Sequence, residues 1–202
     1  MPVPNPSIGA KKTVAIDSEK YLIRTIDVAD ASDRWASWMS DPEAIHMLNL
    51  RARPWTKADV LDYIKTFDQR SSLLLGIFDK QSGAHIGIFT VYINSLRSQF
   101  LVNLLIGEPN YRNQHVTSSI ALPFREYFFE TLGLNTALAS VLARNAPMIH
   151  YLKKNGWTLD QTVKHNTRSH ADGAMLDVCL FSLSRDAWRR WKQKILAQGD
   201  KG

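Results

Sequence analysis

The segment YRNQHVT, residues 111–117, lies where the chain could bind an anion. It follows an apolar run that predicts a strand over residues 99–106, and it precedes a helical pattern that begins near residue 117. A turn that opens a helix directs several free backbone N–H groups at one point, and the positive end of the helix dipole lies behind them. The chemistry that this loop offers is therefore the binding of a phosphate or pyrophosphate group.

Hydrophobic periodicity predicts the strands and helices that must position this loop. We expect strands over residues 21–26, 73–79, 85–94, 99–106, 136–142, 158–165 and 175–183. Helices are expected around residues 31–41, 57–70, 117–132, 145–155 and from residue 184 onward, with Thr56 as the N-cap of the second. The strands on either side of the third helix should be parallel, because a right-handed crossover joins them. These patterns predict an α+β fold with a mixed, mainly antiparallel sheet of about seven strands and helices on both sides.

Three prolines stand in the first six positions and predict a loose N-terminal arm over residues 1–18. No linker, repeat or low-complexity tract follows this arm. Residues 19–202 are therefore expected to form one domain that includes the C-terminal helix. The tryptophans of that helix, Trp188 and Trp191, indicate packing against the sheet or a contact in a homodimer.

Composition and charge narrow the classes of function. The chain has 202 residues, 45% of them hydrophobic, which excludes a large multi-domain assembly and a disordered protein. A single cysteine, Cys179, excludes an internal disulfide and a cysteine-based zinc cluster. No apolar stretch approaches the ~18 residues of a membrane span, so we expect a cytoplasmic protein without a membrane partner. The net charge of +6 lies mostly in the C-terminal half, which is compatible with an anionic ligand and equally with a solvated basic surface. The basic residues are too scattered to favour nucleic-acid binding.

Two further segments carry a resemblance to a known family. Residues 128–135, FFETLGLN, are similar to the pattern F-x-E-L-G-L-N, and residues 145–157, NAPMIHYLKKNGW, are similar to N-x-x-S/A-I-x-x-L/Y-E-K-x-G-F. The loop YRNQHVT stands where that family has Y-R-G-K-G-hydrophobic-G/A. Over residues 21–183 the sequence thus resembles the GNAT superfamily of acyl-CoA N-acyltransferases, and within it the branch of the ribosomal-protein alanine N-acetyltransferases.

This resemblance implies a GNAT-like sheet and an acyl-CoA, in the first place acetyl-CoA, as co-substrate, with no metal. The pyrophosphate would lie on the backbone of the loop, and the pantetheine arm would run along residues 102–106 like an additional strand. The residues that the resemblance implies for coenzyme A are Leu104, Leu105, Ile106, Arg112, Asn113, Gln114, His115, Val116, Thr117, Asn145 and Tyr151.

The sequence departs from the family pattern at two places. The three glycines of the loop are replaced by Asn113, His115 and Thr117, although glycine there lets the backbone approach phosphate and adopt left-handed dihedral angles. The tyrosine that often serves as the acid is replaced by Leu152, and Tyr151 lies one residue earlier, about 100° round the helix. We therefore do not assign the role of the acid to Tyr151. Leucine at this position is also common in the ribosomal-protein branch.

Acyl transfer from a thioester to an amine requires a neutral amine, a donor to the developing oxyanion and a proton for the departing thiolate. Glu108 is the only acid in residues 80–125, and it is the candidate general base, with an exposed turn residue as the alternative interpretation. Asn145 is the second candidate catalytic residue, since the resemblance implies that it contacts pantetheine or orders a water. The oxyanion would be bound by a backbone N–H near Leu105 or Ile106.

Residues expected to bind the acceptor lie in two loops. Arg53 and Trp55 occupy the loop before the second helix, and His165 and His170 lie in or beside the segment NTRSHADG, which borders the acceptor cleft in the resembled fold. Together with Asp172 these histidines make a metal site a minor alternative, because such polar hairpin loops are common without a metal. We expect no metal here.

The function expected from these patterns is transfer of an acyl group, in the first place acetyl, from acyl-CoA to a primary amine by direct attack. The acceptor would be a protein N-terminus, an amino sugar or a small amine. One alternative is an acyltransferase of the same fold that uses a longer-chain or carrier-protein thioester. A second is a catalytically silent domain of this fold that binds a ligand or a partner.

Overall fold

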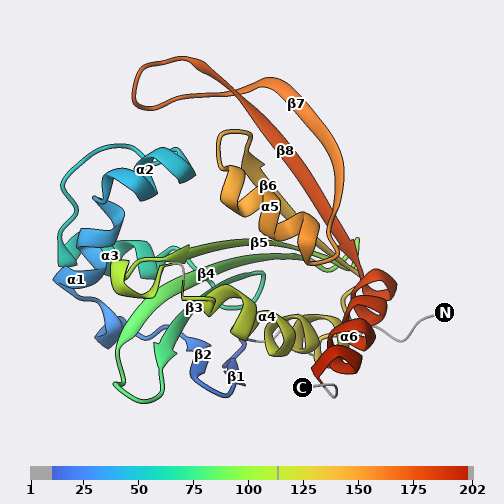
Figure 1. Ribbon diagram of the computed structural model, residues 1–202. Coiled ribbons are helices and arrows are strands. Elements are labelled where there is room, and N and C mark those ends of the chain that lie inside the picture. Colours follow the sequence, from blue (N-terminus) through green and yellow to red (C-terminus); the bar gives the residue numbers. More distant parts are fainter. Residues whose placement is uncertain (1–10, 113, 200–202) are drawn as a thin grey trace.

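The computed structural model describes residues 11–112 and 114–199, which fold around an eight-stranded sheet (Figure 1). The strand order is β1-β2-β3-β4-β5-β6-β8-β7, and every neighbouring pair is antiparallel except β5 and β6. The predicted mixed, mainly antiparallel sheet is thereby confirmed. The strands are β1 (Ala15–Asp17), β2 (Tyr21–Thr25), β3 (Ser72–Asp79), β4 (His85–Asn94), β5 (Gln99–Ile106), β6 (Thr136–Leu142), β7 (Thr158–Arg168) and β8 (Met175–Ser184).

The eighth strand, β1, lies inside the segment predicted to be a loose arm. Val14 and Ile16 are buried against the sheet, and β1 pairs with β2. The prediction of an arm over residues 1–18 is therefore wrong for this part, because alternate apolar side chains here have a core to enter. Residues 1–10 lie outside the described residues.

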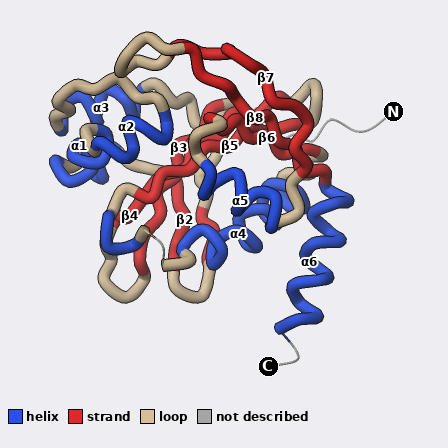
Figure 2. Tube along the Cα trace, turned by 45° about the horizontal axis from the view of Figure 1, so that its top comes forward, coloured by secondary structure: helices blue, strands red, loops and turns tan. Residues whose placement is uncertain are grey.

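Six helices cover the sheet (Figure 2): α1 (Asp33–Met39), α2 (Pro42–Leu48), α3 (Lys57–Lys65), α4 (Val116–Glu126), α5 (Ala146–Lys154) and α6 (Arg185–Gly199). Thr56 caps α3 as predicted, and its hydroxyl accepts a hydrogen bond from the Asp59 N–H. The sequence analysis missed α2 because Asp41-Pro42 reads as the end of a helix. The same pair starts one here: the Asp41 carboxylate caps the helix and Pro42 takes its first position.

The two faces of the sheet bury separate clusters. Phe89 stacks on Phe124 of α4, and Phe100 stacks on Phe128 of the π-helical turn that follows α4 (Tyr127–Thr131), with 4.8 Å between the last two ring centroids. On the opposite face Ile88 and Leu74 pack against α1 and α3, around the fully buried Trp35. Alternation along the strands produces this division, because successive side chains leave opposite faces of a sheet. Because β3, β4 and β5 are apolar at nearly every position, both faces of the sheet are apolar and each has to be covered by helices.

We predict that truncating a buried leucine of the central strands is costly and that truncating an exposed one is not. Leu75 in β3 is 0% exposed and Leu96, in the β4–β5 turn, is 100% exposed. Leu75→Ala should lower the free energy of unfolding by about 2–5 kcal/mol, and Leu96→Ala should change it by less than about 0.5 kcal/mol. Urea unfolding of both variants tests this, and equal losses would contradict the assignment of the core.

Candidate active site

The parallel contact between β5 and β6 is short. Only three residue pairs are in register, Gln99–Leu101 against Thr136–Leu138. Beyond them the strands diverge, and a cavity of about 200 Å³ opens between β5, β6, α4 and α5. We call this the first cavity. Its lining includes Val102, Leu104, Thr117, Ile120, Arg125, Ala139, Val141, Asn145, Tyr151 and Leu152.

A second cavity, of about 300 Å³, lies on the other face of the sheet, beside α1 and α3. Leu48, Asn103 and Leu104 line both cavities, so the two spaces meet at β5. Among the described residues no Asp or Glu lines either cavity, and Arg125 is the one charged residue that does. The remaining lining of the second cavity is Met39, Leu50, Tyr63, Ile88, Thr90, Tyr92 and Leu105.

The N-terminus of α4 faces the first cavity through Thr117. The first N–H groups of α4, on Val116, Thr117 and Ser118, have no acceptor within the helix, and no side chain caps this end. His115, in the place of a family glycine, adopts the left-handed conformation with φ 58°. Histidine enters this region several-fold more readily than most residues, so the loop keeps the backbone shape that glycine would give. Asn113, predicted to bind coenzyme A, lies outside the described residues.

The side chain of Arg112 anchors the loop to the protein. Its Nε and Nη2 donate to the carbonyls of Ile106 and Gly107 at 3.2 Å and 3.0 Å, and its Nη1 lies 2.9 Å from a Glu43 oxygen. This guanidinium therefore joins the end of β5 to α2. Because the Arg112 and Gln114 N–H groups both donate to carbonyls of the preceding turn, the amides that remain for an anion are those at the start of α4.

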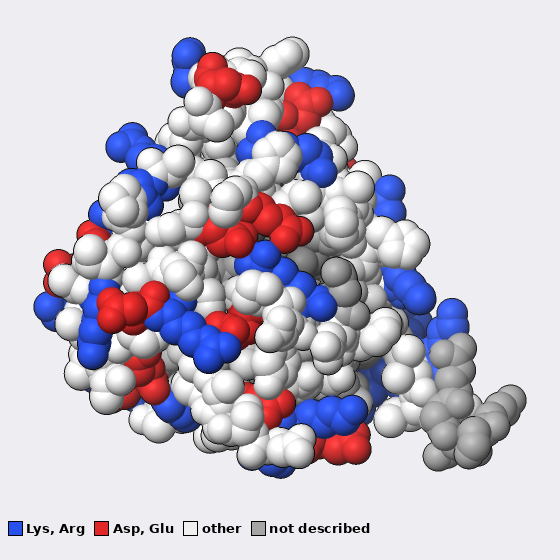
Figure 3. Space-filling model, turned by 60° about the vertical axis from the view of Figure 1, so that its left-hand side comes forward, with Lys and Arg blue, Asp and Glu red and all other residues white. Residues whose placement is uncertain are grey.

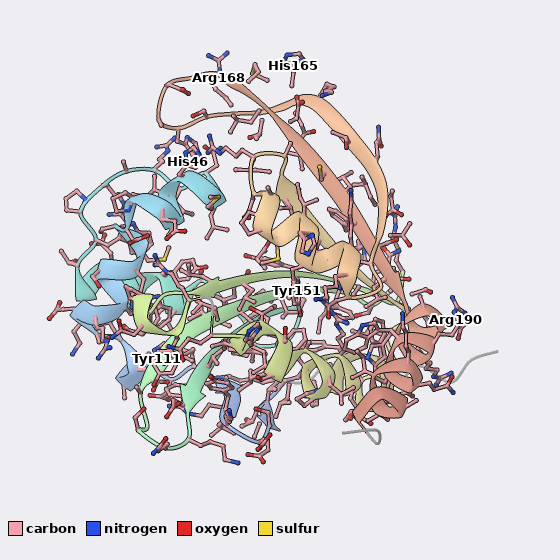
Figure 4. The ribbon with its side chains drawn as sticks, in the orientation of Figure 1. His46, Tyr111, Tyr151, His165, Arg168 and Arg190 are labelled. Carbon is pink, nitrogen blue, oxygen red and sulfur yellow. The ribbon has the colours of Figure 1, made fainter. Side chains whose placement is uncertain are left out.

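Helix α5 forms the opposite wall of the first cavity. Asn145 caps this helix, and its Oδ1 accepts from the Met148 N–H at 3.2 Å, so its amide nitrogen is the group left for a ligand. The Tyr151 hydroxyl donates to the Thr117 carbonyl at 3.3 Å and thus links α5 to α4. Tyr151 is labelled in Figure 4. Burial raises the pKa of Tyr151. The phenol is therefore protonated at neutral pH.

Arg125 places a buried cation at the bottom of the first cavity. It is 4% exposed, its guanidinium stacks over Trp191 at 4.5 Å, and its Nη1 donates to the Asn155 carbonyl at 3.2 Å. Burial lowers its pKa. Arg125 was not predicted from the sequence, and the signal available was its place one residue after Phe124 on the apolar face of α4.

Glu108 lies at the end of β5 and is 4% exposed, so the alternative of an exposed turn residue is wrong. Both of its oxygens accept from Arg34, and Oε1 also accepts from the Trp38 indole N–H at 2.8 Å. These contacts, with Arg34 foremost, lower the pKa of Glu108. Gly107 beside it has no room for a side chain, since a Cβ there would lie 2.0 Å from Trp38. Glu108 lines neither cavity, and its role as a base stays a prediction.

The four residues predicted to bind the acceptor lie outside both linings. Arg53 pairs with Asp59 at 2.6 Å and stacks over Trp55 at 4.4 Å. His165 and His170 lie toward the tip of the β7–β8 hairpin, where their backbone N–H groups donate to Asp177 and Asn49. Their contact with an acceptor stays a prediction.

The polar lining of the second cavity escaped the sequence analysis. Asn103 donates to the Thr90 hydroxyl at 3.1 Å across β5 and β4, and Tyr63 and Tyr92 add two phenols. A signal was present, because Thr90 and Asn103 are isolated polar residues within otherwise apolar strands. Within the described part of the chain, no group of three or more His, Cys, Asp or Glu could hold a metal, and no helix is long and apolar enough to cross a membrane.

Residues 20–158 match the family model described as the acetyltransferase (GNAT) domain. The chain belongs to the GNAT acetyltransferase family. It is accordingly an acyl-CoA-dependent N-acyltransferase, and the two cavities that meet at β5 are the candidate positions for donor and acceptor of this GNAT enzyme. A search of curated proteins finds no match.

Solved GNAT structures share the fold. A GCN5-related N-acetyltransferase from Brucella melitensis superposes with a TM-score of 0.78 at 16% identity, covering 96% of this chain and 90% of its own. A ribosomal-protein-S5-alanine acetyltransferase from Vibrio fischeri gives 0.71 at 17% identity, with coverage of 87% and 98%. Spermidine N-acetyltransferase from Vibrio cholerae, in complex with CoA and spermine, gives 0.73 at 13% identity, with coverage of 84% and 98%.

We predict that Glu108→Gln lowers the free energy of unfolding by about 1 kcal/mol at pH 7. The loss is small because Arg34, the other member of the ion pair, has an exposed side chain. The folded-state pKa of Glu108 is lowered, so its stabilisation is present above the unfolded pKa of about 4.3 and is lost as the pH falls through the folded value. The difference from the wild type should therefore shrink in acid. Urea unfolding at several pH values measures it.

Glu126→Gln is the control for this prediction, because the side chain of Glu126, which pairs with Lys192, is 46% exposed against 6% for Glu108, and its loss should cost less. A difference for Glu108→Gln that persists unchanged at low pH would contradict the ion-pair account. If the decline of the rate at low pH disappears in Glu108→Gln, but not in Glu126→Gln, Glu108 is the base, because a base is inactive once it is protonated.

Proposed function

We propose that this GNAT enzyme transfers acetyl from acetyl-CoA to a primary amine at the end of a peptide chain. The observation that carries the proposal is the pair of cavities that meet at β5, neither of which is lined by a carboxylate from the part of the chain that the structure describes. A polyamine has several ammonium groups, and each would need a negative partner inside the site. A peptide N-terminus has one amine followed by amides, which suit the Asn103 amide, the Thr90 hydroxyl and the apolar walls of the second cavity.

The donor would occupy the first cavity. Its pyrophosphate would accept from the N–H groups of Val116, Thr117 and Ser118, at the positive end of the α4 dipole. Pairing between β5 and β6 ends at Leu101, so the backbone of β5 beyond this residue is free on that edge. The pantetheine amides would hydrogen-bond to this free edge in the way that an additional strand does. The amide nitrogen of Asn145 and the apolar side chains of β6 and α5 complete the channel.

In the reaction the amine nitrogen forms a bond to the thioester carbon, and the carbon–sulfur bond breaks. A backbone N–H of β5 near Leu105 binds the oxyanion. Since no carboxylate of residues 11–112 or 114–199 lines the cavities, the ammonium proton leaves to water. The departing thiolate needs a proton, and Thr117, Ser140 and Tyr151 are the hydroxyl residues of the first cavity. Of these only a phenol approaches a thiol in acidity. We therefore propose Tyr151 as the donor from its place in the first cavity, although the sequence pattern, which has Leu152 at the family's position for the acid, did not assign it this role.

Calorimetric titration with acetyl-CoA tests the donor site, with two variants of His115. His115→Gly should bind as tightly as the wild type or more tightly, because glycine favours the left-handed backbone. His115→Ala removes the same imidazole but resists this backbone, and should bind about tenfold more weakly. Equal weakening in both would show that the imidazole, not the backbone, holds the donor. Failure of the wild type to bind any acyl-CoA would favour the silent domain.

Release of free thiol from acetyl-CoA tests the acceptor. A peptide rich in Ala and Ser with a free N-terminus should give a kcat/KM at least about tenfold above that of spermidine. This is the ratio expected if one further ammonium group of spermidine finds no negative partner in the site. The same peptide with a blocked N-terminus is the control. Preference for spermidine would overturn the acceptor class, and faster turnover of a long-chain acyl-CoA would favour the longer-chain donor.

A further inference from the structure

Arg125 is a buried cation that has no acidic partner within the described part of the chain. It lines the first cavity and is 4% exposed. The one ionisable side chain there whose charge would act on it is Tyr151, and this phenol is neutral at neutral pH because burial raises its pKa. A buried cation without a counter-charge costs free energy. An anionic ligand in the first cavity would remove that cost.

The contacts of Arg125 leave most of its N–H groups free for such a ligand. A guanidinium carries five N–H donors in one plane. Its Nη1 donates to the Asn155 carbonyl at 3.2 Å, at the C-terminal end of α5, which supplies only part of a negative charge. Trp191 and Trp157 lie over the guanidinium at 4.5 Å and 5.8 Å, and contacts of this kind occupy its face rather than its edge. The edge formed by Nε and Nη2 therefore remains for a partner with two oxygens, such as a carboxylate.

Arg125 lies at the depth that the thioester of the donor would reach. Helix α4 runs back along β5 in the opposite direction, because it forms the crossover from β5 to β6. The rise along α4 from Val116 to Arg125 is about 13 Å. The distance along β5 from Ile106 back to Val102 is also about 13 Å. Arg125 is therefore level with Val102, where the free edge of β5 begins and the proposed pantetheine arm ends.

Small side chains leave room in this part of the first cavity. Ala121 precedes Arg125 by one turn of α4, and Ala137 and Ala139 belong to β6; all of them line the cavity. Their methyl groups offer an acyl chain apolar walls and no hydrogen-bonding partner. Walls of this kind around one cation suit a ligand with a short chain of methylene groups and an anionic end.

We propose that Arg125 binds the terminal carboxylate of a dicarboxylic acyl group, so that the enzyme accepts donors of the succinyl-CoA type in addition to acetyl-CoA. Turnover of such a donor rests on the proposed transfer to a peptide amine, but its binding does not. The reaction has the same balance as acetyl transfer: the amine nitrogen bonds to the thioester carbon, the carbon–sulfur bond breaks, the ammonium proton leaves to water and the thiolate takes a proton. The product is an amide that ends in a carboxylate, so a negative charge replaces the positive charge of the amine.

Calorimetric titration of the full-length protein with succinyl-CoA and butyryl-CoA tests the carboxylate site. The two acyl groups have the same number of carbons and differ in the carboxylate that stands in place of a methyl group. The wild type should bind succinyl-CoA at least about tenfold more tightly, because the carboxylate pairs with a buried cation. Arg125→Met should abolish this preference, and Arg125→Lys should keep part of it, since the ammonium retains the charge but not the planar edge. Arg190→Met is the matched control and should keep the wild-type ratio, because Arg190 of α6 is exposed and lines neither cavity (Figure 4).

Three results of the titration would overturn the proposal. A wild type that binds butyryl-CoA as tightly as succinyl-CoA contradicts the site without any variant, so the test does not depend on the folding of Arg125→Met. An equal loss of affinity for both donors in Arg125→Met would show that the guanidinium holds the coenzyme A part. Free succinate that competes with butyryl-CoA, while succinyl-CoA is not preferred, would show that the site takes a separate carboxylate.

Competition between the two donors tests turnover. A peptide with a free N-terminus is incubated with equal amounts of succinyl-CoA and butyryl-CoA, and mass spectrometry measures the ratio of succinylated to butyrylated product. The ratio should exceed about ten in the wild type and in Arg190→Met, and it should fall at least about tenfold in Arg125→Met. Predominance of the butyrylated product in the wild type would overturn the use of succinyl-CoA as a donor. If the wild type modifies the peptide with neither donor but still prefers succinyl-CoA in the titration, the proposed acceptor fails while the carboxylate site is upheld.

Discussion

The early end of pairing between β5 and β6 is the feature on which the site depends. Backbone N–H and C=O groups of a strand normally find partners, and leaving them without one in a buried place costs free energy. Here the parallel ladder stops after three residue pairs, and β5 continues to Ile106 with its β6-facing edge open. A substrate with amides of its own can complete that edge. In the proposed donor site the sheet acts as a binding surface because it is incomplete.

Ion pairs attach the end of β5 to neighbouring helices. At its end, Arg112 joins the carbonyls of Ile106 and Gly107 to Glu43 of α2, and Glu108 holds Arg34 of α1. These ion pairs attach the helices of one face to the strand that both cavities share. These ion pairs position β5 and do not contact the substrates, because their side chains line neither cavity. Figure 3 shows Lys and Arg interspersed with Asp and Glu over this side, so no single-sign field directs the substrates there.

Sequence patterns predicted most of the sheet because its strands are continuous apolar runs with clear turns between them. The ranges of β4, β5 and β6 coincide with the predicted ones. Prediction from local sequence failed where one residue pair is compatible with both the end and the start of a helix. Asp41-Pro42 was interpreted as a helix end, but it begins α2. They also could not show contacts between distant segments: Arg34 lies 74 residues from Glu108, and Asn49 lies 121 from His170. The loop was recognised from its place between strand and helix, although the backbone angle of His115 had to come from the structure.

Backbone amide exchange with and without saturating acetyl-CoA tests the open edge of β5 most directly. The account predicts slower exchange on binding over residues 102–106 and 116–118, where the donor would cover backbone N–H groups. Residues of β1 and β2 should be unchanged, because these strands lie far from β6 in the strand order. Binding without protection of residues 102–106, or protection confined to other elements, would contradict it.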